Sequence, residues 1–169
     1  MYRYFSRFGK GVNNGAEVLR YKMILPEFEV MARVSEFYRT VADKVEDFCR
    51  AELCEYAAKE YSVNESSGER SRFRTLRYLL EGRVTYDDGE TVFVSLCASL
   101  VKNGAVTRSY DAHAWSYEDQ RLIPPTQAAR IFIPKGRLPR EVRRADGIYV
   151  SEGRMFACRG RELTEIELK

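Results

Sequence analysis

The sequence predicts an α+β fold in which an antiparallel β-meander packs against one long amphipathic α-helix, with a small C-terminal β-hairpin. Two turn dipeptides, Asp88-Gly89 and Asn103-Gly104, divide residues 73–117 into three segments that alternate apolar and polar residues, as strands of a half-buried sheet do. The segment that begins near Pro26 instead repeats apolar residues at three-and-four spacing, which is typical of an amphipathic helix. These patterns together predict a helix laid across a meander.

The composition indicates one domain of ordinary size. A chain of 169 residues, 44% of them hydrophobic, is long enough to bury a substantial core. The 28 basic and 25 acidic residues nearly cancel to a net charge of +3, so no strong field of one sign follows. No run approaches the roughly 20 apolar residues of a membrane span, and the N-terminus lacks the apolar middle of a signal peptide. We therefore expect a cytoplasmic protein without a membrane span.

The N-terminal half supplies an arm, a strand and the helix. Residues 1–15 are aromatic and basic and form either a mobile arm or an edge element, ahead of a single domain over residues 16–169. Residues 16–25 alternate and predict a first strand. Pro26 suits the first turn of a helix, because its missing N–H costs nothing there, and we expect this helix to end near Tyr61. The apolar face of the helix consists of Val34, Phe37, Tyr38, Val41, Val45, Phe48, Cys49, Leu53 and Tyr56.

The meander has two faces, which two-residue turns at both dipeptides would fix. One face carries small residues, among them Gly82, Ser95 and Ala112, that would let a helix approach closely, and we place the helix there. A single extra residue in either turn would exchange the faces. The opposite face joins an apolar stripe of the middle strand to charged and aromatic residues: Glu81, Arg83, Val92, Val94, Leu96, Asp111, His113 and Trp115.

The C-terminal part is predicted to add small elements to a core of residues 19–132. Prolines 124 and 125 stop the last meander strand and lead into a short helix over residues 127–132. Residues 133–169 form a basic extension, with eight Lys or Arg against three acidic residues between Lys135 and Arg161. Within it, residues 148–150 and 155–158 flank a turn and predict the terminal hairpin.

Candidate site residues gather on the face that we predict to lie away from the helix. His113 is the only histidine, so a His-rich metal site is excluded and any catalytic triad would have to use it. The sequence lacks the common nucleophile, phosphate-loop and dinucleotide motifs. We therefore predict no catalytic residue, no metal and no cofactor. We predict that a ligand contacts Arg83, Asp111, His113 and Trp115, unless the C-terminal segment covers the apolar stripe between them.

Two alternatives from other functional classes stay open. A hydrolase would use Asp111, His113 and Glu81, whose two carboxylates lie on strands separated by one intervening strand. A nucleic-acid binder would use the N-terminal aromatic rings interleaved with Arg3 and Arg7, together with the basic residues 137–144. We weigh nucleic acid as the less favoured partner, because the mixed charges are typical of a solvated surface.

The order of elements also resembles a known family. A strand, a Pro-started helix and a meander lead into Tyr110-Asp-Ala-His-Ala-Trp-Ser-Tyr-Glu-Asp-Gln-Arg-Leu-Ile-Pro-Pro, which resembles a bacterial family of uncharacterised domains over about residues 19–132. That family occurs in the extracytoplasmic part of lysozyme-sensing anti-sigma factors and beside peptidoglycan deacetylase domains. The resemblance implies a non-catalytic α+β recognition domain, whose partner is a protein or a cell-envelope ligand.

Overall fold

The computed structural model describes residues 1–69 and 72–168, so Lys169, the last residue of the predicted extension, lies outside the described residues. About 48% of the chain is sheet. The larger sheet consists of β1 (Tyr2–Asn13), β2 (Ala16–Phe28), β3 (Leu76–Asp87), β4 (Thr91–Lys102), β5 (Ala105–Ser116) and β6 (Leu122–Ile123). The smaller sheet consists of β7 (Gly147–Ser151), β8 (Arg154–Arg159) and β9 (Glu162–Ile166).

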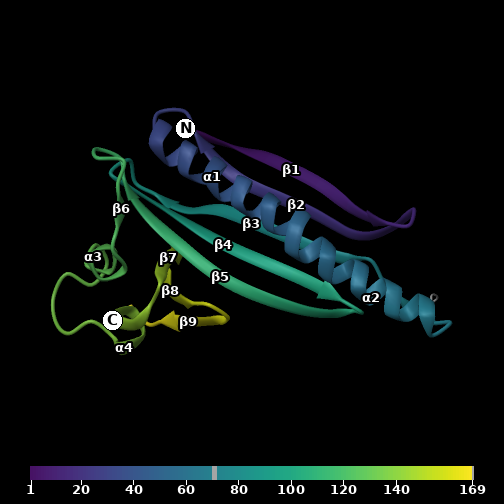
Figure 1. The fold of residues 1–169 in the computed structure, drawn as a ribbon. Coiled ribbons are helices and arrows are strands. Elements are labelled where there is room, and N and C mark those ends of the chain that lie inside the picture. Colours follow the sequence, from purple (N-terminus) through teal and green to yellow (C-terminus); the bar gives the residue numbers. More distant parts are fainter. Residues whose placement is uncertain (70–71, 169) are drawn as a thin grey trace.

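One helix of 35 residues crosses the larger sheet (Figure 1). It comprises α1 (Ala32–Phe48), a π-helical stretch η1 (Cys49–Leu53) and α2 (Cys54–Ser66). The helix carries the chain from the end of β2 back to the start of β3, which is why these two strands pair in parallel. The other neighbours in the sheet pair antiparallel, and the sheet curls as a half-barrel.

The predicted architecture, a single meander packed on one helix, is wrong. Residues of the predicted arm form β1, which pairs with β2 from Tyr2 opposite Phe28 to Asn13 opposite Ala16. Pro26 does not start the helix, since it lies within β2. A proline is tolerated there because the ladder between β2 and β3 ends at Ile24, so no N–H of Pro26 is needed on that side.

The first meander turn differs from the prediction, and the second agrees with it. Asn103 and Gly104 form a two-residue turn with φ values of 49° and 84°. At the first turn, however, Asp87 pairs with Val92, and the register shifts between Val84 and Tyr86. This shift moves the side chains of β3 to the other face relative to those of β4, which is the exchange that one extra residue causes.

On β4 and β5 the helix therefore covers the face on which we had placed the ligand, and its predicted position there is wrong, whereas on β3 it covers the predicted face. Val34, Tyr38 and Ala42 of α1 are fully buried in one core with strand residues. The strand residues of this core include Leu76, Leu80, Val92, Val94, Leu96 and Trp115. The apolar stripe of β4 is thus neither exposed nor covered by the C-terminal segment.

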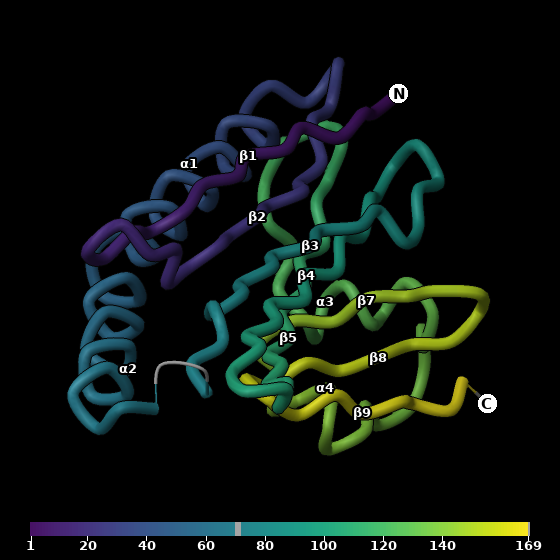
Figure 2. Tube along the Cα trace, turned by 90° about the vertical axis from the view of Figure 1, so that its right-hand side faces the viewer, coloured from purple at the N-terminus to yellow at the C-terminus, as the bar shows by residue number. Residues whose placement is uncertain are grey.

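The smaller sheet covers part of the opposite face of the larger sheet, so the helix and the smaller sheet form outer layers (Figure 2). The predicted C-terminal hairpin is present as β7 and β8, and β9 extends it. A Cβ atom added to Gly147 would lie 2.1 Å from the carbonyl oxygen of Ala112, so only glycine allows this approach. Two short helices, α3 (Pro125–Ala129) and α4 (Arg140–Arg144), complete this layer and its separate core. Among the described residues, no helix has both the length and the apolarity to cross a membrane.

Candidate binding surface

The structure places the four predicted ligand contacts on two faces. Asp111, His113 and Trp115 lie on the helix side of β5, whereas Arg83 is exposed on the other face of β3 and pairs with Glu81 at 2.8 Å. The cause is the register shift near the first meander turn. The four residues do not form one site, and Glu81 is likewise separated from the other members of the proposed hydrolase group.

Trp115 and His113 instead join the sheet to the helix through Tyr38. The indole Nε1–H of Trp115 donates to the Tyr38 hydroxyl at 3.0 Å, and this hydroxyl lies 3.2 Å from Nδ1 of His113. The Phe37 ring packs edge-on against both rings, at centroid distances of 5.1 Å and 5.0 Å. Burial raises the pKa of Tyr38, so its hydroxyl stays protonated. This cluster holds α1 in place, and Trp115, at 5% exposure, has almost no surface left for a ligand.

Asp111 and His113 lie at the edge of this cluster, on a pocket of about 200 Å³ that also includes Asp146. Nε2 of His113 lies 3.4 Å from the Asp111 carboxylate. Burial acts to raise the pKa of Asp111, but hydrogen bonds from His113 and from the Ala112 amide outweigh it and hold this pKa below its ordinary value. Across residues 1–69 and 72–168, no group of three or more His, Cys, Asp or Glu is placed to hold a metal ion.

The outer face of β2 and β3 carries a surface that the sequence reasoning missed. The parallel register sets Arg20 beside Arg77 and Lys22 beside Leu79. These residues line a groove of about 260 Å³, which adjoins a second groove of about 390 Å³. Arg77 and Val101 line both grooves. We call the combined surface the basic groove and define it by Arg20, Lys22, Arg74, Arg77, Leu79, Ser99 and Val101.

The positive charge of the basic groove is largely uncompensated. Within the described part of the chain, Lys22, Arg74 and Arg77 form no ion pair, and neither does Lys10, which lies opposite Arg20 on β1. Arg20 itself pairs with Glu17 at 2.7 Å. Several basic residues on the helix side are engaged in ion pairs instead: Arg3 and Arg39 pair with Glu27, Arg7 with Asp43 and Glu46, and Arg50 with Glu46.

The floor of the groove is aliphatic. Leu79 is 36% exposed there, and Val101 of β4 lies two residues along from its partner Ser99, opposite Arg77. Tyr21 and Tyr78 also border the groove, but their rings are directed to the helix side. The Tyr21 hydroxyl lies 3.3 Å from Glu46, and the Tyr78 ring packs on Phe48 at 6.2 Å. The lining of the groove therefore offers cations around an apolar strip, and the exposed ring of Phe8 stands beside it, opposite Lys22 on β1.

Alternation within each strand was the signal available in the sequence. It places Arg20 and Lys22 on one face of β2, and Arg77 and Leu79 on one face of β3. It does not show that β2 and β3 are neighbours, because the whole helix separates them in the chain. The groove exists only once this crossover pairs the two strands.

Solved structures show which class of fold this is. No protein-family model matches the sequence, and no curated protein matches it. A DUF3298 family protein from Bacteroides fragilis has a similar structure, with a TM-score of 0.59 at 9% sequence identity. A DUF3298 family protein from Pseudomonas aeruginosa is also similar, with a TM-score of 0.55 at 10% identity. Both alignments cover 99% of this chain and 89% of the other.

At such low identity, these comparisons show a shared fold. The chain has the fold of domains assigned to a family of unknown function, which agrees with the coarser part of the resemblance in the sequence. The association with anti-sigma factors or peptidoglycan deacetylases stays a prediction.

Proposed function

We propose that the chain is a non-catalytic binding module whose basic groove binds an acidic peptide segment of a partner protein. The observation that supports this most directly is the set of cationic side chains without ion-pair partners around the aliphatic floor of Leu79 and Val101. Complementary charge steers association and fixes the register of a partner, while an apolar strip adds buried area.

A peptide suits the groove better than a single-stranded nucleic acid. Nucleic-acid binding of that kind relies on aromatic rings on which successive bases stack. The rings of Tyr21 and Tyr78 are used on the helix side, so the floor itself offers no row of rings, and Phe8, opposite Lys22 on β1, adds one exposed ring beside it. Arg3 and Arg7, which we had considered for phosphate contact, are engaged in ion pairs with Glu27, Asp43 and Glu46. An acidic peptide needs only carboxylates and apolar side chains in alternation.

Binding of a fluorescent peptide that alternates Glu and Val tests the proposal by anisotropy at several salt concentrations. We expect affinity to fall as salt rises, because exposed charges are screened. The double variant Lys22→Ala, Arg77→Ala should lose about tenfold in affinity, since each exposed charge pair contributes roughly 0.5–1 kcal/mol.

The matched control is Arg33→Ala, Lys44→Ala, which removes the same charge from exposed positions on the helix. This control should bind within about twofold of the wild type if the groove is the site. An equal loss in both double variants would overturn the assignment to the groove. Tighter binding of a single-stranded oligonucleotide of the same charge would replace the peptide by nucleic acid as the partner.

A further inference from the structure

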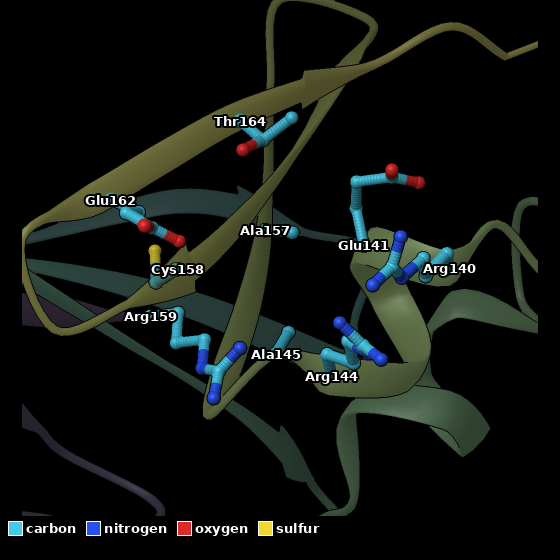
Figure 3. Close-up of a pocket in the computed structure, with 9 residues that line it drawn as sticks. All are labelled: Arg140, Glu141, Arg144, Ala145, Ala157, Cys158, Arg159, Glu162 and Thr164. Atoms are coloured by element: carbon cyan, nitrogen blue, oxygen red, sulfur yellow. The ribbon is translucent and has the colours of Figure 1, made fainter.

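A second concave site lies between α4 and the smaller sheet, on a different part of the molecule (Figure 3). Its volume is about 210 Å³. We call it the arginine pocket, and the residues that matter to its chemistry are Arg140, Arg144, Ala145, Ala157, Arg159 and Thr164. It shares no residue with the basic groove.

Three arginines converge on this pocket from two elements. Arg140 and Arg144 are four residues apart on α4, so they lie on the same face of the helix. Arg159 ends β8 and stands across the pocket from them, as Figure 3 shows. The sequence indicated only a basic stretch between Lys135 and Arg161. The tertiary structure brings these three arginines of that stretch to one pocket.

Small and polar residues leave room between the arginines. Ala145 and Ala157 line the pocket with single methyl groups. The pairing of β8 with β9 sets Thr164 opposite Ala157 and Glu162 opposite Arg159. In Figure 3 the Glu162 carboxylate lies on the side away from Arg140 and Arg144, and the Glu141 carboxylate points away from the pocket. The pocket is therefore cationic on the α4 side, whereas on the side of the smaller sheet Arg159 stands beside Glu162.

The guanidinium groups have no carboxylate partner of their own. Among the described residues, none of Arg140, Arg144 and Arg159 takes part in an ion pair, although Arg154 on the same strand pairs with Glu152 and Glu165. A guanidinium keeps its charge at every physiological pH, and its planar N–H donors match the oxygens of a carboxylate or a phosphate. Three such groups around one cavity are the donor set that an oxyanion requires.

We propose that the arginine pocket binds a small ligand through an oxyanion group, a carboxylate or a phosphate, held by Arg140, Arg144 and Arg159. The rest of the ligand lies against Ala157 and within reach of the Thr164 hydroxyl. Glu162, which lies opposite Arg159 on β9, disfavours a second anionic group on that side of the pocket, so ligands with one anionic end bind better than those with two. Binding is non-covalent, because burial raises the pKa of the neighbouring Cys158 thiol to about 12 and leaves it unreactive.

Titration of the isotope-labelled full chain with sodium phosphate, sodium acetate or disodium succinate, followed by amide NMR at constant ionic strength, tests the proposal. We expect saturable shifts at millimolar concentrations that cluster on α4, β8 and β9. Arg144→Gln should weaken binding about tenfold, because it removes one charge-assisted hydrogen-bonding group. The matched control is Arg143→Gln, which changes an exposed neighbour on α4 that does not line the pocket.

The separate arms identify the ligand group. Shifts with phosphate alone assign the site to phosphates, and shifts with acetate alone assign it to carboxylates. Glu162→Gln should strengthen succinate binding relative to acetate binding if Glu162 repels a second anion. No saturable shift with any of the three salts, or an equal loss of binding in Arg143→Gln and Arg144→Gln, would overturn the proposal. None of these outcomes depends on whether the basic groove binds a peptide.

Discussion

The Tyr38 hydroxyl is the single group that most directly joins α1 to β5. It accepts the N–H of Trp115, and its own proton satisfies Nδ1 of His113 when Nε2–H of that ring faces Asp111. A buried polar group left without a partner costs more than an average hydrogen bond contributes. In the described part of the chain, every buried side-chain nitrogen and oxygen has a partner, so this network is fully satisfied as it stands.

Replacement of Tyr38 by Phe should lower the free energy of unfolding by about 1–3 kcal/mol, because it leaves the Trp115 N–H buried without an acceptor. Urea denaturation measures this change. Tyr61→Phe is the control, since the Tyr61 ring packs on Phe73 at 5.2 Å and no hydrogen bond of its hydroxyl is seen among the described residues. The control should change stability by less than about 0.5 kcal/mol. Equal losses would mean that the Tyr38 hydroxyl has no special role.

At the scale of elements, β1 is the strand that the meander prediction lacked. Its backbone pairs along β2, and on the helix side its Arg7 pairs with Asp43 and Glu46 of α1. Arg3 of β1 and Arg39 of α1 bind the same carboxylate, that of Glu27 on β2, the first at 2.6 Å. Glu27 thus connects β2 to both β1 and α1.

Acidification tests this connection. The hydrogen bonds from Arg39 and then Arg3 lower the pKa of Glu27 below its ordinary value of 4.5. Because the pKa is lower in the folded state, the stabilisation is fully present above pH 4.5 and is lost as the pH falls through the folded pKa. Glu27→Gln should therefore reduce stability at neutral pH and flatten the acid side of a plot of stability against pH.

Glu29→Gln is the control for this measurement, since Glu29 is exposed and forms no ion pair among the described residues. Thermal melts between neutral and acidic pH supply the two curves. An acid limb as steep in Glu27→Gln as in the wild type would show that the carboxylate does not stabilise the junction of β1 with α1.

The whole molecule consists of three layers around two separate cores. The first core lies between the helix and the larger sheet, and the second lies around the smaller sheet and the short helices. Phe93 and Ala114 are the buried large-sheet residues of the second core, on the face away from the helix. The two sheets approach closely at Gly147, where an added Cβ atom would lie 2.1 Å from the carbonyl oxygen of Ala112.

Gly147→Ala should displace the smaller sheet, because the added methyl group meets a backbone carbonyl that cannot rotate away. We expect a loss of about 1–3 kcal/mol or more, as for other overpacked sites. Native-state hydrogen exchange should show reduced protection in β7–β9, with β2 and α1 retaining theirs. Ser151→Ala, at the other end of β7, should leave protection unchanged. Equal loss of protection in both sheets would show that the layers open as one unit.

The sequence by itself determined the features that depend on neighbours in the chain. The alternation of β3, β4 and β5, the Asn103-Gly104 turn, the amphipathic helix and the terminal hairpin all follow from local spacing and turn chemistry. The prediction from sequence failed at the first meander turn, because a register difference of one residue there determines which face of the sheet the side chains of a strand lie on. The shift between Val84 and Tyr86 moved Arg83 and Glu81 away from Asp111, and nothing in the dipeptide Asp88-Gly89 specifies that shift.

Only the tertiary structure decided which surfaces are exposed and which charged side chains lie close together. Arg20 and Arg77 become neighbours through a crossover of one whole helix, and Arg159 meets Arg140 only after β8 folds back on α4. The position of α1 over Trp115 likewise depends on the competition of two layers for the two faces of the sheet. Local patterns determine which face of a strand each side chain lies on. Long-range packing determines which strands and helices become neighbours, because that arrangement minimises the apolar area exposed over the whole chain.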